Sequence, residues 1–175
     1  MKRLLAALFL ALVASLALAL NAASATHSNG HGPKQDLAAG TGQLESSDPF
    51  SGQVVEQKVH VSANSGPMGE DPQGDFRVEA MIPSGEFDID FRGRVTCLHV
   101  IGNRATVGGE VERSNDDRFP EGSGILIHIR DDDEGAGDSF SLTRPQTPPQ
   151  TCQNFRESFE PNTQGNFIVH DATTP

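Results

Sequence analysis

Apolar and polar residues alternate between Phe87 and Val111 over the longest stretch of this kind in the chain. A two-residue period is typical of a half-buried β-strand, because successive side chains point to opposite faces of a sheet. The alternation is interrupted at Gly102-Asn103 and then resumes, and Gly-Asn is a common two-residue hairpin turn of type II′. The stretch therefore predicts a long antiparallel hairpin. The residues of one parity are Phe87, Ile89, Phe91, Val95, Cys97, His99 and Ile101, followed by Ala105, Val107 and Val111 on the return arm.

The register of this hairpin has two solutions. A two-residue loop pairs Val100 with Ala105 but moves the first half of the apolar set to the opposite face. A three-residue loop keeps a single apolar face but asks Arg104 to adopt a left-handed conformation. A β-bulge near Gly93 reconciles the two-residue loop with the pattern, since one extra residue reverses the parity. We favour the two-residue turn with a bulge, and the choice decides whether His99 points inward.

Shorter alternating stretches occur on both sides of the hairpin, separated by segments rich in Gly, Pro, Ser and Asp. No segment outside the first 25 residues shows the period of an amphipathic helix. Seven or so short strands with polar turns predict an all-β protein, an antiparallel meander forming a small β-barrel, with a two-sheet β-sandwich as the alternative. The additional predicted strands are Val54–Ala63, Asp75–Ile82, Gly124–Arg130, Asp138–Leu142 and Asn166–His170.

The N-terminal residues have the features of a secretory signal peptide. Lys2 and Arg3 precede an apolar run, and Ala23-Ser24-Ala25 matches the small-x-small cleavage rule. We therefore expect residues 1–25 to be removed and the protein to be secreted or located at the exterior of the cell envelope. No second apolar run follows, so no transmembrane segment is expected after cleavage. Residues 26–50 are polar and rich in small side chains, which predicts a disordered lead-in, and residues 51–175 are expected to form a single β domain.

Charge and cysteine content limit the partners further. The net charge of −11 becomes −13 once the signal peptide, with two basic residues and no acidic one, is removed. So acidic a chain is expected to repel nucleic acid. Cys97 and Cys152 are the only cysteines, and in an exported chain one disulfide between them is the simplest expectation.

The densest group of carboxylates lies between Asp131 and Asp138, where five acidic residues and two glycines occur in eight positions. Carboxylate oxygens are the usual ligands of Ca²⁺, and Asp131, Asp133 and Asp138 are the predicted ligands of a calcium site. The spacing differs from that of an EF-hand, so a solvated hairpin loop is the competing interpretation. Calcium is the only cofactor that the sequence suggests.

No catalytic motif is present: the chain lacks GxSxG, HExxH, a phosphate-binding loop and a dinucleotide fingerprint. His60 and His128 fall on the polar parity of their predicted strands and are expected at the surface. If the strands close into a barrel, an interior cavity for an apolar ligand is expected to be lined by the large apolar residues Phe76, Phe87, Phe91 and Ile127.

The segment from Gly93 to Val111, with Gly102-Asn103-x-Ala105-x-Val107, together with Ile129-Arg130-Asp131-Asp132 and Gly137-Asp138-Ser139-Phe140, resembles the post-COAP domain family of exported actinobacterial proteins. The resemblance spans about Val54 to Asp171. It departs from the family in the loop at Asp131–Glu134, which is more acidic here. The resemblance implies an exported all-β domain and carries no catalytic residues to this chain.

Three functional hypotheses remain. The first is a secreted, non-catalytic β domain with a binding or envelope-associated role. The second is a small-ligand-binding β-barrel, which requires an interior that side chains do not fill. The third is a secreted hydrolase or cyclase, which requires polar groups that converge at one mouth, with His99 turned inward.

Overall fold

The computed structural model describes residues 35–47, 54–81, 88–132, 137–153 and 158–172, and all regular structure within these ranges is β-strand. Accordingly, the described part of the chain contains no helix that could cross a membrane. The nine strands are β1 (Asp36–Ser47), β2 (Val54–Ser65), β3 (Gln73–Met81), β4 (Asp88–Ile101), β5 (Arg104–Ser114), β6 (Gly124–Arg130), β7 (Ser139–Thr143), β8 (Glu160–Pro161) and β9 (Gln164–His170).

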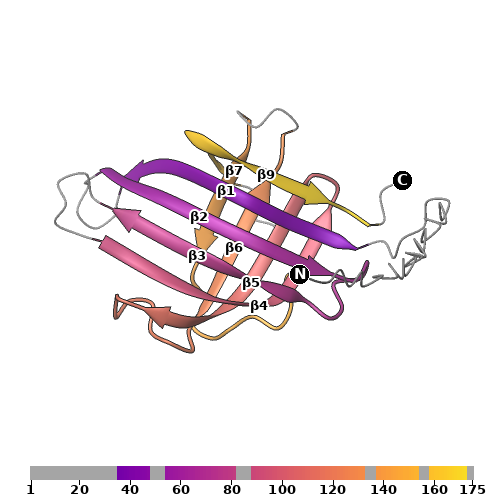
Figure 1. Ribbon diagram of the computed structural model, residues 1–175, viewed down its shortest axis with the longest axis horizontal. Helices are drawn as coiled ribbons and strands as arrows, with labels where there is room; N and C mark the ends of the chain where they lie inside the picture. Colours follow the sequence, from indigo (N-terminus) through magenta and orange to yellow (C-terminus); the bar gives the residue numbers. More distant parts are fainter. Residues whose placement is uncertain (1–34, 48–53, 82–87, 133–136, 154–157, 173–175) are drawn as a thin grey trace, which may run out of the picture. The chain divides into compact units, whose positions relative to one another are not determined.

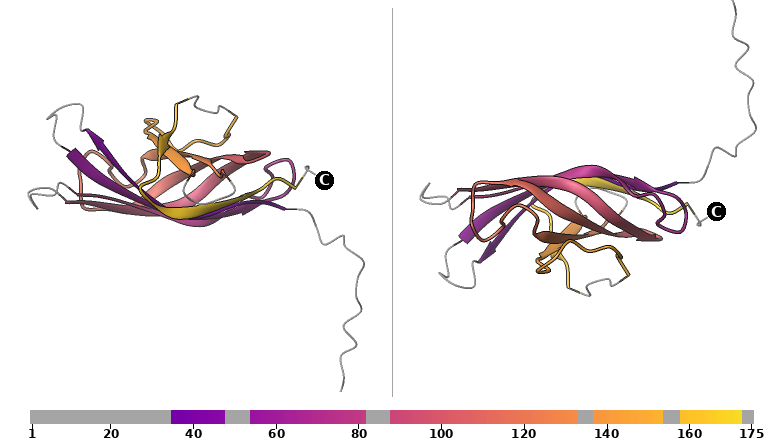
Figure 2. Two further views of the ribbon diagram at one scale, coloured as in Figure 1. Left: turned by 90° about the horizontal axis from the view of Figure 1, so that it is seen from above. Right: turned by 90° about the horizontal axis from the view of Figure 1, so that it is seen from below.

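The strands form one antiparallel sheet in the order β8-β7-β6-β5-β4-β3-β2-β1-β9. Strands β1 to β8 are neighbours in the order of the sequence, which is the predicted meander, and β9 returns to pair with β1. The sheet curls into an open half-barrel. In Figure 1, β1, β2, β3 and β9 run diagonally in front, and β5, β6 and β7 cross behind them. The views in Figure 2 show these two groups as two layers of the same bent sheet.

The core lies between the two layers. Its largest fully buried side chains include four phenylalanines, because the chain has neither Trp nor Tyr. Phe76 and Phe91 pack edge to face with ring centroids 6.4 Å apart, and Phe140 and Phe167 do so at 6.0 Å. Each such pair adds about 0.5–1.5 kcal/mol to the stabilisation from burial. Phe167 therefore fixes β9 against β7 although the two strands do not pair.

The central hairpin has the two-residue turn predicted from the sequence. Val100 pairs with Ala105, and within the turn only Gly102 has a positive φ, 58°, as in type II′. The register of β4 against β5 shifts near Gly93, as expected, and again between Val95 and Cys97. The second shift reverses the parity, so Cys97 and the half-buried His99 lie on the face directed away from the core.

Strand β1 corrects the prediction of a disordered lead-in over residues 26–50. It spans Asp36–Ser47 and pairs with β2 along its full length. Small residues on the inward face of β1 give this strand a weak hydrophobic pattern. Their small size is needed because β9 packs closely against them. A Cβ atom at Gly40 would lie 2.2 Å from the carbonyl oxygen of Asn166, and one at Gly42 would lie 2.5 Å from the ring of Phe167.

Backbone hydrogen bonds in the turn between β8 and β9 link the two edges of the sheet. Between β8 and β9, the backbone N–H of Asn162 donates to the carbonyl of Asp138 (2.8 Å), and that of Thr163 donates to the carbonyl of Gln43 on β1 (2.7 Å). The chain thus passes from β8 at one edge of the sheet to β9 at the other edge within a few residues. This corner holds the two layers together along one side.

Candidate functional site

A cavity of about 550 Å³ lies between the two layers of the sheet. This volume is within the range of sites for small organic ligands, about 300–1,000 Å³. Its wall is mainly apolar and is contributed by both layers. The apolar lining residues are Leu44, Val55, Val78, Ala80, Ile89, Phe91, Phe119, Ile125 and Leu142; the polar ones are Ser46, Ser47, Gln57, Arg118, Ser141, Thr143, Arg144 and Glu160.

The cavity exists because the core is filled unevenly along the barrel. Phe76 and Ile127 are fully buried in the core and do not line the cavity, whereas Phe91 does. Ala80 contributes only a methyl group to the wall at a position where a larger side chain would project into the space. Of the cavity residues expected from the sequence, Phe91 therefore lines this cavity and Phe76 and Ile127 lie outside it, while a role in ligand binding stays a prediction. Phe87 lies outside the described residues.

Phe119 comes from the loop between β5 and β6, and sequence periodicity gave no sign of it. Its ring stacks on that of Phe91 with centroids 4.4 Å apart and an angle of 15° between the planes. The guanidinium of Arg144 lies over the same ring, 5.3 Å from its centroid. One aromatic side chain thus joins the apolar wall to a cationic group, an arrangement that suits a ligand with an apolar body and a polar end.

Arg118 is fixed beside this aromatic pair by Asp116. Its side chain donates three hydrogen bonds to the two carboxylate oxygens, the shortest of 2.8 Å, and its backbone N–H donates a fourth. Burial raises the pKa of Asp116, but the hydrogen bonds from Arg118 together outweigh it, and the net shift is downward. The pair therefore stays ionised at neutral pH and orders the loop that carries Phe119.

The acidic loop between β6 and β7 uses its carboxylates to hold β9. Asp138 is fully buried; its Oδ1 accepts the backbone N–H of Asp132 (3.0 Å) and its Oδ2 accepts that of Phe167 (2.6 Å). Asp131 Oδ2 accepts the backbone N–H of Val169 at 2.9 Å. These bonds satisfy the outer edge of a strand that pairs only with β1. We call Asp131 and Asp138 the carboxylate clasp.

The clasp gives two of the three predicted calcium ligands a structural role, and Asp133 lies outside the described residues. Within the described ranges, no group of three or more His, Cys, Asp or Glu side chains is arranged to hold a metal ion. A calcium ion at Asp131 and Asp138 would have to share oxygens that already accept backbone N–H groups. Calcium binding stays a prediction.

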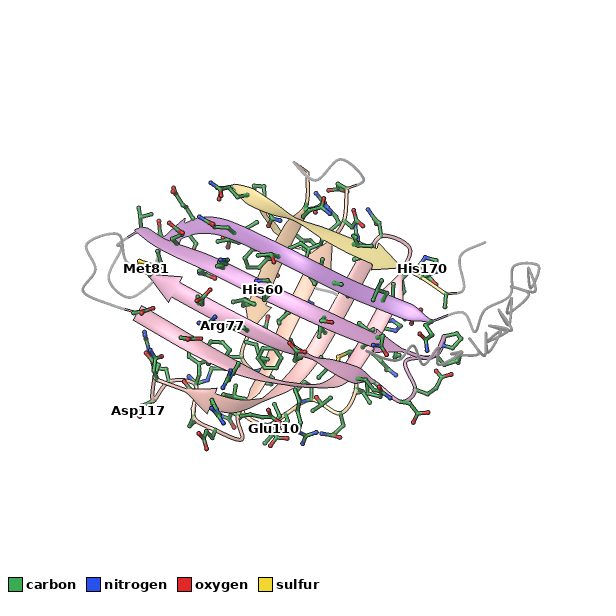
Figure 3. The ribbon with its side chains drawn as sticks, in the orientation of Figure 1. His60, Arg77, Met81, Glu110, Asp117 and His170 are labelled. Atoms are coloured by element: carbon green, nitrogen blue, oxygen red, sulfur yellow. A yellow bond between two sulfur atoms is a disulfide. The ribbon has the colours of Figure 1, made fainter. Side chains whose placement is uncertain are left out.

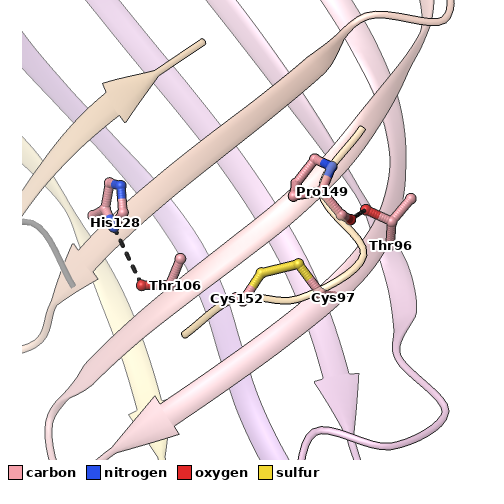
Figure 4. The surroundings of a disulfide bond; sticks show 6 residues. All are labelled: Thr96, Cys97, Thr106, His128, Pro149 and Cys152. Atoms are coloured by element: carbon pink, nitrogen blue, oxygen red, sulfur yellow. Dashed lines mark hydrogen bonds between the residues drawn. A yellow bond between two sulfur atoms is a disulfide. The ribbon is translucent and has the colours of Figure 1, made fainter. Parts of the chain in front are cut away.

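The disulfide between Cys97 and Cys152, predicted from the sequence, attaches residues 144–153 to the outer face of β4 and β5 (Figure 4). Thr96 donates a hydrogen bond from its hydroxyl to the carbonyl of Pro149. Gly108 provides the space for the tether, since a Cβ atom there would lie 2.4 Å from Cys97 Sγ.

His128 is buried, with 3% of its surface exposed, and the expectation of a surface histidine is wrong. It lies on the outward parity, as the pattern indicated, but the tethered segment passes over this face. Its Nδ1 is 3.2 Å from the hydroxyl of Thr106 (Figure 4). Alternation in the sequence reports which face a residue occupies and carries no information about a distant segment that covers that face.

Comparisons with protein-family models, with curated proteins and with solved structures find no match for this chain. The resemblance to the post-COAP domain family accordingly stays a prediction from the sequence.

Proposed function

We propose that this protein is a secreted, non-catalytic β domain that binds a small amphipathic molecule in the cavity between its two layers. The observation that supports the proposal most directly is the apolar wall that surrounds about 550 Å³. A cavity of this size is far larger than the voids left in a close-packed core, and apolar surface exposed to it gains free energy when a ligand covers it. The disulfide and the predicted signal peptide favour an extracellular location.

The mouth of the cavity indicates how the ligand is oriented. The apolar part would lie against Phe91 and Ala80, and the polar end would face Arg144 and Arg118. Because Arg118 is already paired with Asp116, Arg144 is the residue with which an anionic end would pair. A medium-chain fatty acid such as dodecanoate has this combination of a flexible apolar body and a single carboxylate.

The absence of Trp from the sequence allows a background-free binding experiment. In a Phe119→Trp variant the only indole would sit at the cavity wall, and dodecanoate is expected to change its fluorescence in a saturable manner. In the same background, Ala80→Phe fills the cavity and is expected to abolish the response. Ser62→Phe is the matched control, because Ser62 is exposed on β2 and its side chain does not line the cavity.

Urea unfolding of each variant ensures that loss of binding reflects a filled cavity and not an unfolded protein. Leu142→Phe on β7, opposite the buried Ile127, provides a second variant with a reduced cavity should Ala80→Phe fail to fold. Dodecanoate binding of equal strength in the filled variants and in the Ser62→Phe control would exclude the cavity as the site. An absence of any response to dodecanoate in the parent variant would refute the proposed ligand class.

A further inference from the structure

Four basic side chains lie in register across β2, β3, β4 and β5 on the face of the sheet directed away from the core. His60 is opposite Arg77, Arg77 is opposite Arg92, and Arg92 is opposite Arg113. Directly opposite residues of antiparallel strands project from the same face, with Cβ atoms about 4.5–5.5 Å apart. Figure 3 labels the first two members on neighbouring strands. In a chain with a net charge of −11, this row places positive charges together.

The first two members of the row have partners within the protein. The ring of His60 is hydrogen-bonded to the hydroxyl of Thr41, with 3.0 Å between Nδ1 and Oγ1. Arg77 donates two hydrogen bonds to the carboxylate of Asp90, at 2.9 and 2.7 Å, and forms an ion pair with Glu79. The hydrogen bonds from Arg77 hold the pKa of Asp90 below its usual value. Asp90 is therefore charged at neutral pH; Arg77 binds it directly, and the charge of Arg92 contributes to the same downward shift of its pKa.

Arg92 and Arg113 differ from the other two. Both are exposed, they are directly opposite one another, and within the described ranges neither forms an ion pair or a hydrogen bond with another side chain. Like charges at directly opposite positions destabilise a sheet. Some opposite positions on this face carry complementary charges, as for Lys58 with Glu79 and Arg94 with Glu110. Glu79 and Asp90 are alike in charge, but both form ion pairs with Arg77. Arg92 and Arg113 are thus two cations at opposite positions of this face that no ion pair within the described ranges neutralises.

The two arginines border a shallow groove of about 380 Å³ that is also lined by Arg77, Asp90, Phe91, Ser114 and Asn115. The carboxylate in this lining, Asp90, is hydrogen-bonded to Arg77. The end of β5 beside this groove is held in place by Asn115. Its Oδ1 accepts the backbone N–H of Asp90 at 2.7 Å, and its Nδ2 donates to the carbonyl of Asp88 at 3.2 Å. The backbone of β4 and β5 is therefore fixed on both sides of the groove before any ligand arrives, which lowers the entropic cost of binding.

We propose that Arg92 and Arg113 form a binding site for a tetrahedral oxyanion, the phosphate or sulfate group of a small molecule. Each guanidinium presents a planar fork of N–H donors that matches the oxygens of such a group. Two forks on neighbouring strands supply more donors than the two oxygens of a carboxylate accept, whereas a dianion with three or four oxygens balances both charges. The site lies on the opposite face of the sheet from the apolar cavity and does not depend on the function proposed for it.

The experiment compares the melting temperature of the full chain in inorganic phosphate, in sulfate and in chloride at constant ionic strength. The variants are Arg92→Gln on β4 and Arg113→Gln on β5. The matched control is Arg94→Gln, which removes the same charge from the same face, on the strand of Arg92, but from a paired arginine. Phosphate and sulfate are expected to raise the melting temperature of the parent and of Arg94→Gln by a few degrees relative to chloride. The two other variants are expected to show only the smaller, general stabilisation by phosphate and sulfate that does not require a binding site.

Both test variants are expected to fold, because each removes a like-charge contact, and their melting temperatures in chloride should equal or exceed that of the parent. Glycerol phosphate distinguishes a free ion from an ester: binding as tight as that of inorganic phosphate indicates a site for the free anion, and binding at least tenfold tighter indicates an esterified group. Equal stabilisation of the parent and of Arg92→Gln by phosphate would overturn the proposal. So would the absence of any difference between phosphate and chloride for the parent.

Discussion

Asp138 of the carboxylate clasp provides the sharpest test of how the sheet is held closed. The residue is fully buried, and its two oxygens accept backbone N–H groups from Asp132 and Phe167. Hydrogen bonds to a charged group contribute about 1.5–3 kcal/mol each. Asp138→Asn keeps one acceptor oxygen and replaces the other with a donor that faces an N–H group. We therefore expect it to lower the free energy of unfolding by about 2 kcal/mol.

Asp138→Ala removes both acceptors and leaves the N–H of Phe167 without its partner, so a loss of about 3–5 kcal/mol is expected. This is a large share of the stability of an ordinary domain, about 5–15 kcal/mol. Urea unfolding of the oxidised protein measures both losses. At a typical slope of about 2 kcal/mol per molar urea, the Asn variant should shift the midpoint by about 1 M.

Asp132→Asn is the matched control because it removes a charge from the same loop. Asp132 is partly exposed and accepts a hydrogen bond from Arg130 Nε at 2.7 Å, a surface ion pair for which about 0–1 kcal/mol is expected. If Asp138→Asn costs no more than Asp132→Asn, the carboxylate clasp does not hold β9. Repeating the unfolding with calcium and with a chelator tests the predicted metal site, since calcium binding would shift the midpoint of the parent and not that of Asp131→Asn.

Two further predictions concern the outer face and the pH dependence of stability. Replacing Cys97 and Cys152 with Ala should lower the free energy of unfolding in urea by about 4 kcal/mol, because the disulfide closes a loop over 55 positions. Gly108→Ala should be destabilising in the oxidised protein and less so in the variant without the two sulfur atoms. An equal loss of stability in both backgrounds would show that Gly108 does not provide the space for the disulfide. Burial raises the pKa of Asp36 in the folded protein above its ordinary value of 3.8. The stability that its protonated form contributes is therefore fully present below pH 3.8 and is lost as the pH rises through the pKa of the folded state. Asp36→Asn keeps an acceptor for the N–H of Ala172 and should stabilise the protein at pH 7 but not at pH 3; an equal effect at both pH values would contradict this reasoning.

The sequence predicts the strands whose pattern is produced by the core alone. The hairpin around Gly102 is an example, because alternation and turn chemistry are both local and both agree with the structure. Alternation and turn chemistry do not predict strand β1. Its Gly40 and Gly42 accommodate β9, which is more than 100 residues away in the sequence. The weak pattern of β1 is a consequence of tertiary packing.

The candidate sites depend even more strongly on contacts between distant segments. Phe119 lies in a loop, and only the fold places its ring on Phe91. Arg92 and Arg113 become neighbours only because a bulge sets the register of β4 against β5, which no pattern of single residues indicates. The acidic loop is conspicuous in the sequence, but Asp138 is directed at the backbone of Phe167, a partner that the local sequence does not reveal.

The pairing of the first strand with the last has a consequence for the order of events during synthesis. Ala38 is opposite Val169, so β1 lacks one of its two neighbours until almost the whole chain has been made. Hairpins such as β4–β5 can form as soon as their own residues are available, whereas β1 must wait. Contacts of such long sequence separation slow folding, because the entropy of closing the loop is lost before the contacts form. Completion of the sheet is therefore expected to be a late and slow step, governed by the arrival of β9.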